Sequence, residues 1–143
     1  MPIFEVKKFS ESTFKRMRNP AKVYLIDISL ARKVTSQDYG RILENIVFLE
    51  LRREADEIFY FSEDNECDFI VKKHNKFYPY QVTFELTPKN KEREINGLIL
   101  ACKWLNVDEG IILTYDQEDE YIEQRMKIRI IPVWKWIVWK KFG

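Results

Sequence analysis

The sequence predicts an α/β domain with a mixed central sheet, an antiparallel meander plus a parallel strand, flanked by helices. Three observations predict this fold class. The 143 residues suffice for one domain with a buried core. Short apolar runs bounded by turn signals, which are typical of strands, are interspersed with longer segments of helical periodicity. A composition of 45% hydrophobic and 33% charged residues excludes a disordered chain.

The N-terminal residues are the least regular part of the sequence. Residues 1–21 are mixed and polar and contain Asn19-Pro20, a turn signal, so we expect a linker or arm there. The domain proper is then expected to cover residues 22–143. It begins with a short apolar strand at 23–26.

A buried helix is predicted next. Ser36 or Asp38 is a suitable N-cap, and the helix is expected to run to about Glu54. Its residues are apolar around most of the circumference, which is typical of a helix covered by protein. Glu44 falls among the apolar positions, and a carboxylate in such surroundings needs a partner.

Three strand-like runs follow the helix, at residues 58–61, 67–72 and 77–84. The connections are short, and Asn75 marks a tight turn, so the runs predict an antiparallel meander. Pro79 cannot donate to a ladder, which indicates an edge or a bulge where the third strand begins.

A second helix is predicted from Thr87, as N-cap, and Pro88, at the first helical position, to Trp104. The strand at 110–115 has no polar face, which indicates a central strand, parallel to the one before the helix. Residues 116–124 are expected to form an acidic loop. The remaining residues predict a half-buried strand and a short aromatic helix, at 127–131 and 133–140.

Charge is distributed unevenly along the chain. Residues 1–35 carry +5, residues 36–124 carry −10 and residues 125–143 carry +6, which agrees with the net charge of +1. The basic ends are able to contact nucleic-acid phosphates, or they pair with the acidic middle. No apolar run approaches the length that spans a bilayer, and the N-terminus lacks the apolar core of a signal peptide, so we expect a cytoplasmic protein.

Three polar residues interrupt apolar patterns, and they are the candidate site. They are Glu44 on the first helix, Asp68 at the start of one strand, and Gln81 inside the next. Two carboxylates and an amide oxygen form a site of the kind that Mg²⁺ or Mn²⁺ accepts. Alternatively, each carboxylate forms a structural ion pair and Gln81 a structural hydrogen bond.

Several segments in order carry a family resemblance. They are Lys22-Val-Tyr-Leu-Ile-Asp27, Gly40–Arg53, Glu66-Cys-Asp-Phe-Ile-Val71, Gln81-Val82, Lys91-Glu-Arg-Glu-Ile95, Gly110–Asp116 and Ile131–Ile137. Together they resemble the C-terminal domain, of unknown function, of mainly archaeal AAA-type ATPases. That domain is similar to the PD-(D/E)XK, restriction-endonuclease-like, nuclease fold.

The resemblance implies roles for particular residues. Glu44 corresponds to the helix carboxylate of the nuclease motif, Asp68 to its Asp, and Gln81-Val82-Thr83 to its (D/E)-X-K element. Thr83 thus stands where the motif has a Lys that assists the attacking water. Other cations are candidates for that charge and for phosphate binding, namely Lys72, Lys73, Lys91 and Arg93.

Two functions follow from the resemblance. One is a metal-dependent DNA endonuclease that uses Glu44, Asp68 and Gln81 with Mg²⁺ or Mn²⁺. The other is a non-catalytic module that binds nucleic acid or couples an ATPase to a protein partner, which Thr83 favours. No phosphate-binding loop of the Gly-x-x-x-x-Gly-Lys-Ser/Thr type occurs, so the chain, an excised domain or a stand-alone remnant, is not expected to bind ATP.

Overall fold

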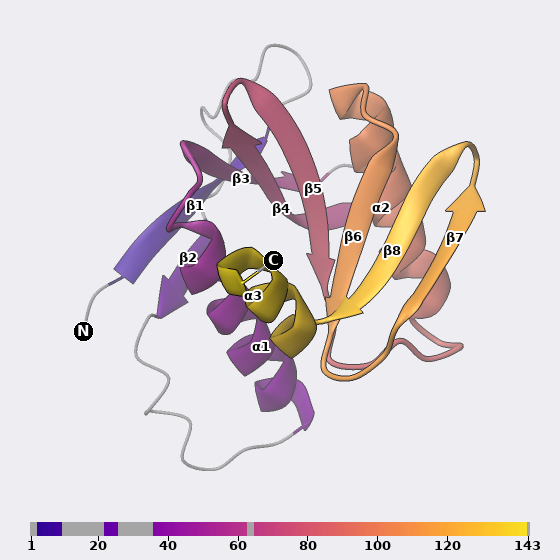
Figure 1. Ribbon diagram of the computed structural model, residues 1–143, viewed down its shortest axis with the longest axis horizontal. Helices are drawn as coiled ribbons and strands as arrows, with labels where there is room; N and C mark the ends of the chain where they lie inside the picture. The colour runs from indigo at the N-terminus through magenta and orange to yellow at the C-terminus, as the bar shows by residue number, and fades with distance from the viewer. Residues whose placement is uncertain (1–2, 10–21, 26–35, 63–64, 143) are drawn as a thin grey trace.

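The computed structural model describes residues 3–9, 22–25, 36–62 and 65–142 (Figure 1). The elements in chain order are β1 (Ile3–Phe9), β2 (Lys22–Leu25), α1 (Ser36–Leu51), β3 (Glu57–Ser62), β4 (Glu66–Lys73), β5 (Lys76–Val82), α2 (Lys91–Leu105), β6 (Glu109–Thr114), β7 (Asp119–Glu123), β8 (Met126–Pro132) and α3 (Val133–Phe142). Within these ranges, no helix is both long enough and apolar enough to cross a membrane.

The described strands form one sheet in the order β2-β1-β3-β4-β5-β6-β8-β7. Strands β3, β4 and β5 are successively antiparallel, and β6 is parallel to β5 on one side and to β8 on the other. The predicted α/β class, the antiparallel meander and the central parallel strand are confirmed. A restriction-endonuclease-like core remains a prediction.

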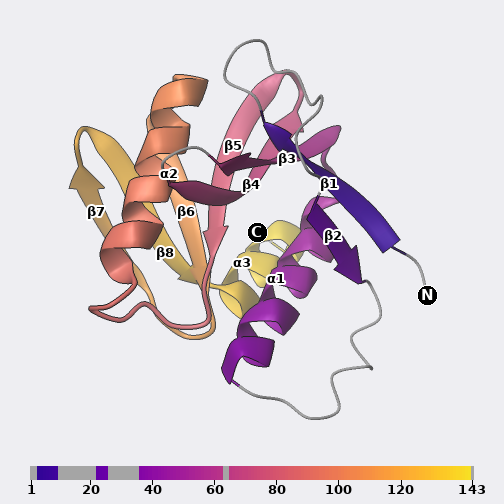
Figure 2. The same ribbon diagram turned by 180° about the vertical axis from the view of Figure 1, so that it is seen from behind.

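Helices cover both faces of the sheet, so that the core has two halves. Helix α2 lies on one face, and α1 and α3 lie on the other (Figures 1 and 2). Leu98 of α2 and Val47 of α1 are each completely buried against the sheet, one on either side. Strands between two helical layers need apolar residues on both faces, which explains why β6 reads as a continuous apolar run.

The first helix is buried as predicted, but it is shorter than expected. Leu43, Val47 and Leu51 are buried on one stripe, at the spacing of successive turns. The helix ends at Leu51, so Glu54 lies beyond it and accepts a hydrogen bond from Lys73 Nζ at 3.0 Å. That contact is possible because the chain has already turned toward the end of β4.

The predicted turn and strand edge within the meander are confirmed. His74 and Asn75 have φ values of 51° and 63°, the pair of positive angles that a two-residue hairpin turn needs. The register between β5 and β6 begins at Tyr80, so Pro79 precedes the paired part of the strand. Because Pro79 has no partner in β6, its missing N–H removes no hydrogen bond between β5 and β6.

The acidic loop expected at 116–124 is wrong in part, because Asp119–Glu123 form strand β7. This strand pairs antiparallel with β8 and is last in the sheet order. An edge strand needs only backbone partners on one side, and here four of its five side chains are exposed. It therefore shows none of the apolar alternation by which strands are recognised.

The expected start of the second helix is corrected by the structure. Helix α2 begins at Lys91, because the chain first makes a turn in which Asn90 Oδ1 accepts a hydrogen bond from the Thr87 N–H at 2.8 Å. Asn90, not Thr87, is the N-cap residue.

Within the arm expected at 1–21, Ile3–Phe9 form β1, which is parallel to β3. Strand β2 pairs with it on the other side, and this backbone pairing does not require an apolar pattern.

Candidate functional site

Strands β4 and β5 separate at the position of the predicted site. Their ladder runs from the hairpin turn as far as the pair Phe69 and Tyr80. Beyond it, side chains replace the backbone partners. The Asp68 N–H donates to Gln81 Oε1 at 2.9 Å, and the Val82 N–H donates to Asp68 Oδ2 at 2.8 Å. We call Asp68, Gln81 and Val82 the strand fork.

A bulge in β4 accompanies the fork. Phe59 of β3 pairs with Ile70 of β4, whereas Phe61 pairs with Cys67, so β4 has one extra residue in this interval. A bulge bends its strand and redirects the side chains within it. The position of Asp68, one residue after Cys67, is therefore a consequence of the strand register.

Gln81 is the most deeply buried polar residue of the fork, with 2% of its surface exposed. Its Nε2 donates to the carbonyl oxygens of Glu66, at 2.7 Å, and Glu94, at 3.0 Å. With two carbonyls on one side and the Asp68 N–H on the other, only one orientation of the amide satisfies all three partners. The amide thus connects β4, β5 and α2 through their backbones.

Gly97 allows helix α2 to approach this network. A Cβ at position 97 would lie 1.9 Å from the Glu66 carbonyl oxygen and 2.7 Å from Gln81 Nε2. Neither neighbour can retreat without losing its hydrogen bond. A residue without a side chain is therefore required where the helix crosses the fork.

A polar pocket of about 270 Å³ opens beside the fork. It is lined by Asn65, Glu66, Asp68, Gln81, Arg93 and Glu94. Burial raises the pKa of the Glu94 carboxyl, and the nearby carboxylates of Glu44 and Glu66 raise it further, while Arg93 lowers it. The Arg93 guanidinium lies 3.4 Å from Glu94 Oε1. The pocket is thus acidic, with one arginine beside it.

The structure brings together two of the three predicted site residues, Asp68 and Gln81. Glu44 acts electrostatically on Glu94, yet it does not line the pocket. Among the residues described, no three His, Cys, Asp or Glu side chains converge as metal ligands would. Asp68 Oδ2 and Gln81 Oε1 each face a backbone N–H.

The candidate cations lie in different places. Lys72 and Lys73 are at the far end of β4, beside Glu57 and Glu54 respectively. Lys91 lies over the ring of Tyr121, 5.6 Å from its centre, and of the four only Arg93 lines the pocket. The hydroxyl of Thr83 donates to the Glu85 carbonyl oxygen at 3.3 Å.

Glu94 is the pocket residue that the sequence reasoning missed. A signal for it exists in the helical spacing, because Glu94 lies four residues before Leu98 and seven before Ala101, both completely buried. It therefore begins the stripe of α2 that packs on the sheet. Glu94 and Glu44 thus share one feature, since each is a carboxylate that lies among the apolar positions of a helix.

The two cysteines and the single histidine do not line the pocket. Cys67 and Cys102 are buried, as predicted for core residues. The Cys67 thiol donates to the Tyr80 carbonyl oxygen at 3.3 Å, and burial raises its pKa. His74, exposed in the hairpin turn, donates its backbone N–H to Asp56.

Comparison with known proteins identifies the domain. A family model described as "Domain of unknown function (DUF4143)" matches residues 39–136, which include the strand fork, α2 and most of the sheet. The chain belongs to this family. The DUF4143 match begins in α1 and ends in α3, and the predicted resemblance is thereby confirmed at the level of the domain family.

Two relatives of this DUF4143 domain are longer proteins. An uncharacterized protein of Methanocaldococcus jannaschii, MJ1544, is 40% identical over 146 residues, which cover 94% of this chain and 32% of the relative. An uncharacterized protein of Haemophilus influenzae is 34% identical over 86 residues, which cover 57% of this chain and 21% of that protein. The chain thus spans a third or less of each.

Proposed function

We propose that this DUF4143 domain is a non-catalytic recognition module of nuclease-like ancestry, which works beside an ATPase module. One observation carries the proposal. The side chains at the two positions that correspond to the (D/E)-X-K element, Gln81 and Thr83, hydrogen-bond to the chain's own backbone. These contacts with the chain's own backbone favour a structural role for both side chains over a catalytic one.

The chemistry of phosphodiester hydrolysis explains why this matters. A divalent ion activates water only when several oxygen ligands converge on it and leave a position open. Here Gln81 Oε1 faces the Asp68 N–H, and Asp68 Oδ2 faces the Val82 N–H. Thr83 adds no positive charge to polarise the water. Recognition needs none of these groups, which is why a binding role fits better than hydrolysis.

The family context supports an ATPase as the neighbour. Domains of this family often lie C-terminal to AAA-type ATPases. Both relatives are longer than this chain, since it covers 32% of one and 21% of the other. A module attached to an ATPase is suited to selecting the molecule on which the ATPase works.

Metal-dependent hydrolysis is the second candidate, and the acidic pocket favours it. Asp68 and Glu94 share the pocket, and the raised pKa of Glu94 reflects burial and like charge from Glu44 and Glu66. A divalent cation would relieve that repulsion. In this alternative Glu94 supplies the carboxylate that Gln81 lacks.

A cleavage assay tests the proposal. Purified protein is incubated with supercoiled plasmid, single strands and a branched junction, in Mg²⁺, Mn²⁺ or EDTA. We expect no metal-dependent cleavage of any substrate. Asp68→Ala, Glu94→Gln and Glu44→Ala are assayed alongside, with Asp108→Asn as the matched control, because Asp108 is exposed beyond the opposite end of α2.

The variants show whether any observed cleavage comes from this pocket. Cleavage that requires metal, disappears in Asp68→Ala and survives in Asp108→Asn would overturn the proposal in favour of hydrolysis. Cleavage that is equal in all the variants does not come from this pocket and leaves the proposal standing.

A further inference from the structure

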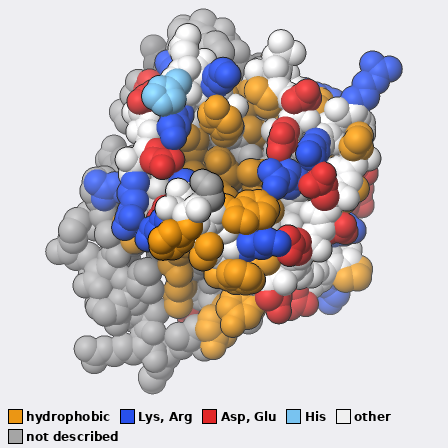
Figure 3. Space-filling view, in the orientation of Figure 1, with side chains coloured by type: hydrophobic (Ala, Val, Ile, Leu, Met, Phe, Trp, Pro, Cys, Tyr) orange, Lys and Arg blue, Asp and Glu red, His pale blue; other side chains and the backbone are white. Residues whose placement is uncertain are grey.

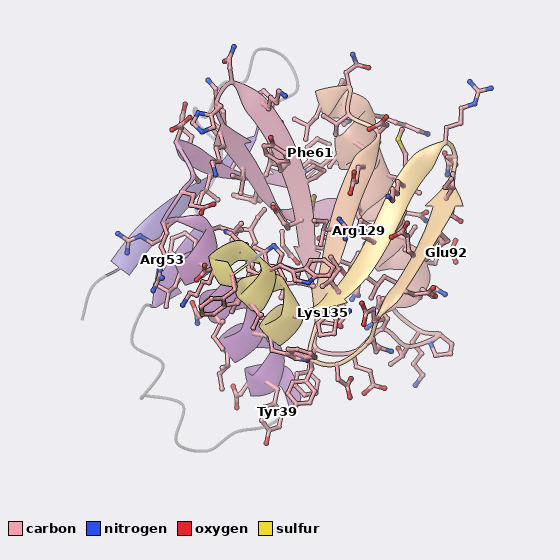
Figure 4. All side chains as sticks on the ribbon, viewed as in Figure 1. Tyr39, Arg53, Phe61, Glu92, Arg129 and Lys135 are labelled. Carbon is pink, nitrogen blue, oxygen red and sulfur yellow. The ribbon has the colours of Figure 1, made fainter. Side chains whose placement is uncertain are left out.

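Three aromatic rings from separate parts of the chain stack at one end of the sheet. Tyr39 of α1 and Phe84, after β5, have ring centres 5.2 Å apart at 28°, and Phe84 and Tyr115, after β6, are 4.8 Å apart at 17°. We call these residues the aromatic stack. Its outer members, Tyr39 and Tyr115, are 47% and 56% exposed. Figure 4 shows Tyr39 projecting from the end of α1, away from the sheet.

Hydrogen bonds hold the two loops of the stack together. The Tyr115 N–H donates to the Phe84 carbonyl oxygen at 3.1 Å. Gln117 binds both backbone groups of Leu86, accepting from its N–H at 2.6 Å and donating to its carbonyl oxygen at 3.0 Å. The completely buried Thr114 in turn holds the backbone of Gln117 through its hydroxyl. The rings are therefore presented in a fixed geometry, which lowers the entropic cost of binding.

The chain segments that carry the stack are acidic in sequence. The segments that carry it, residues 36–40, 83–87 and 114–120, contain six Asp or Glu and no Lys, Arg or His. Of these, Glu118 pairs with Lys135, and Glu120 with Lys127 and Arg129. Glu85 and Asp116, each next in sequence to a ring of the stack, are exposed. Figure 3 shows hydrophobic side chains running through the middle of this face to its lower edge, with acidic and basic ones beside them.

We infer that the aromatic stack is the docking surface for an arginine-bearing, basic segment of a protein partner. A guanidinium is planar, lies flat on an aromatic ring and forms paired hydrogen bonds with a carboxylate. Tyr115 offers an exposed ring, and Asp116, exposed and next to it in the sequence, offers a carboxylate. The inference rests on the proposed function, because it assigns the surface through which a recognition module would act.

Charge selects this occupant over a nucleic acid. An unpaired base stacks on exposed rings as well as a guanidinium does. Its phosphates, however, would approach the acidic segments, and like charges repel. A basic peptide gains from the same charges that a nucleic acid would have to overcome.

Peptide binding tests the inference. Fluorescence anisotropy compares a labelled peptide of three Gly-Ser-Arg repeats with one of three Gly-Ser-Lys repeats, at physiological salt. We expect the arginine peptide to bind about fivefold tighter, since both have the same charge and only the guanidinium stacks well. Tyr115→Ala should weaken the arginine peptide about fivefold, and Tyr115→Phe should restore it. Phe142→Ala, at an 83% exposed ring at the end of α3, is the control and should change nothing.

Three results would overturn the inference. They are equal binding of the two peptides, no binding of either, and arginine-peptide binding that is insensitive to Tyr115→Ala. A labelled oligothymidylate that binds through Tyr115 when the peptides do not would assign the stack to nucleic acid instead. Because the cleavage assay reports on the pocket at Asp68 and the peptide assay on Tyr115, failure of this inference and failure of the proposed function give different results.

Discussion

The strand fork and the aromatic stack meet along the chain, because Phe84 of the stack comes two residues after Val82 of the fork, yet they use their side chains in opposite ways. In the fork, the polar groups of Gln81 and Asp68 point inward and bind the backbone of neighbouring strands. In the stack, the Tyr115 N–H binds the Phe84 carbonyl oxygen, so the hydrogen bond is between backbone atoms. The rings of Phe84 and Tyr115 stack on each other, and Tyr115 is exposed to solvent. Polar chemistry in the first region maintains the fold, whereas the second has an outer face available for contact.

This difference separates what holds the domain together from what it can recognise. A change in the fork should cost stability, because it leaves buried backbone groups without partners. A change in the stack should cost little stability, because its outer rings are half exposed. The four predictions below test this division, beginning with the largest expected effect.

Gly97→Ala should be the most damaging substitution. The added Cβ would lie 1.9 Å from the Glu66 carbonyl oxygen, so α2 must move away and the Gln81 hydrogen bonds must break. We expect a loss of about 3–5 kcal/mol in the free energy of unfolding. Gly40→Ala is the matched control in α1, because among the described residues nothing beyond its chain neighbours and its own helix backbone lies within 4 Å of the added Cβ. It should gain about 0.5–1 kcal/mol. Urea unfolding measures both, and similar values for the two would contradict the prediction.

Gln81→Met should come next. Methionine fills a similar volume but leaves the Asp68 N–H unpaired and removes the amide donor from the Glu66 and Glu94 carbonyl oxygens. We expect a loss of about 2–4 kcal/mol, measured by urea unfolding. Gln124→Met, at an exposed position, should change stability by less than about 0.5 kcal/mol. If Gln81→Met also stayed within that range, the amide would not be the stabilising centre of the fork.

Glu94→Gln should have a smaller effect that depends on pH. Burial and the nearby Glu44 and Glu66 raise the Glu94 pKa above its ordinary 4.5, so the folded state holds this proton more tightly than the unfolded chain does. That contribution favours folding below pH 4.5 and is lost as pH rises through the folded-state pKa. The variant should therefore be more stable than the parent at pH 7, and the difference should shrink toward pH 4.

Thermal unfolding of both proteins across this pH range gives the difference directly. Glu92→Gln serves as the control, because Glu92 is exposed in the same first turn of α2. A pH-independent difference for Glu94→Gln would show that its charge is not in an unfavourable environment.

Tyr115→Ala should have the smallest effect on stability. The ring is 56% exposed and has Phe84 as its stacking partner, so we expect a loss of about 0.5–1.5 kcal/mol. Thermal unfolding measures it. A loss as large as that of Gln81→Met would mean that the stack supports the fold, and the division between the two regions would disappear.

The sequence predicted those parts of the fold where burial leaves a pattern. Helix α1 and the meander have apolar residues at the spacing of their structures, and the turn at Asn75 has its own signal. Strand β7 and the start of α2 were missed for a common reason. Both depend on backbone hydrogen bonds, to β8 for the strand and to the Thr87 carbonyl oxygen for the turn before α2, which impose little pattern on side chains.

The candidate site was predicted in part for a similar reason. Asp68 and Gln81 stood out as polar residues in apolar strands, and the structure brings them together. That Gln81 binds three backbone groups could not be predicted, since the partners depend on the bulge in β4 and on the approach of α2 at Gly97. Residue types indicate where polar groups are buried, whereas their partners follow from the packing of separate elements.

Strand β7 has a consequence for how copies of this domain meet. It forms the outer edge of the sheet, and an edge with unpaired backbone groups is a template for joining another sheet. Asp119, Glu120 and Glu123 stand along its five residues, and Ile122 is 75% exposed among them. Two such edges approaching each other would bring carboxylates together, and the repulsion opposes the edge-to-edge growth that leads to aggregates. The acidic composition of this strand thus protects the protein from polymerising through its own sheet.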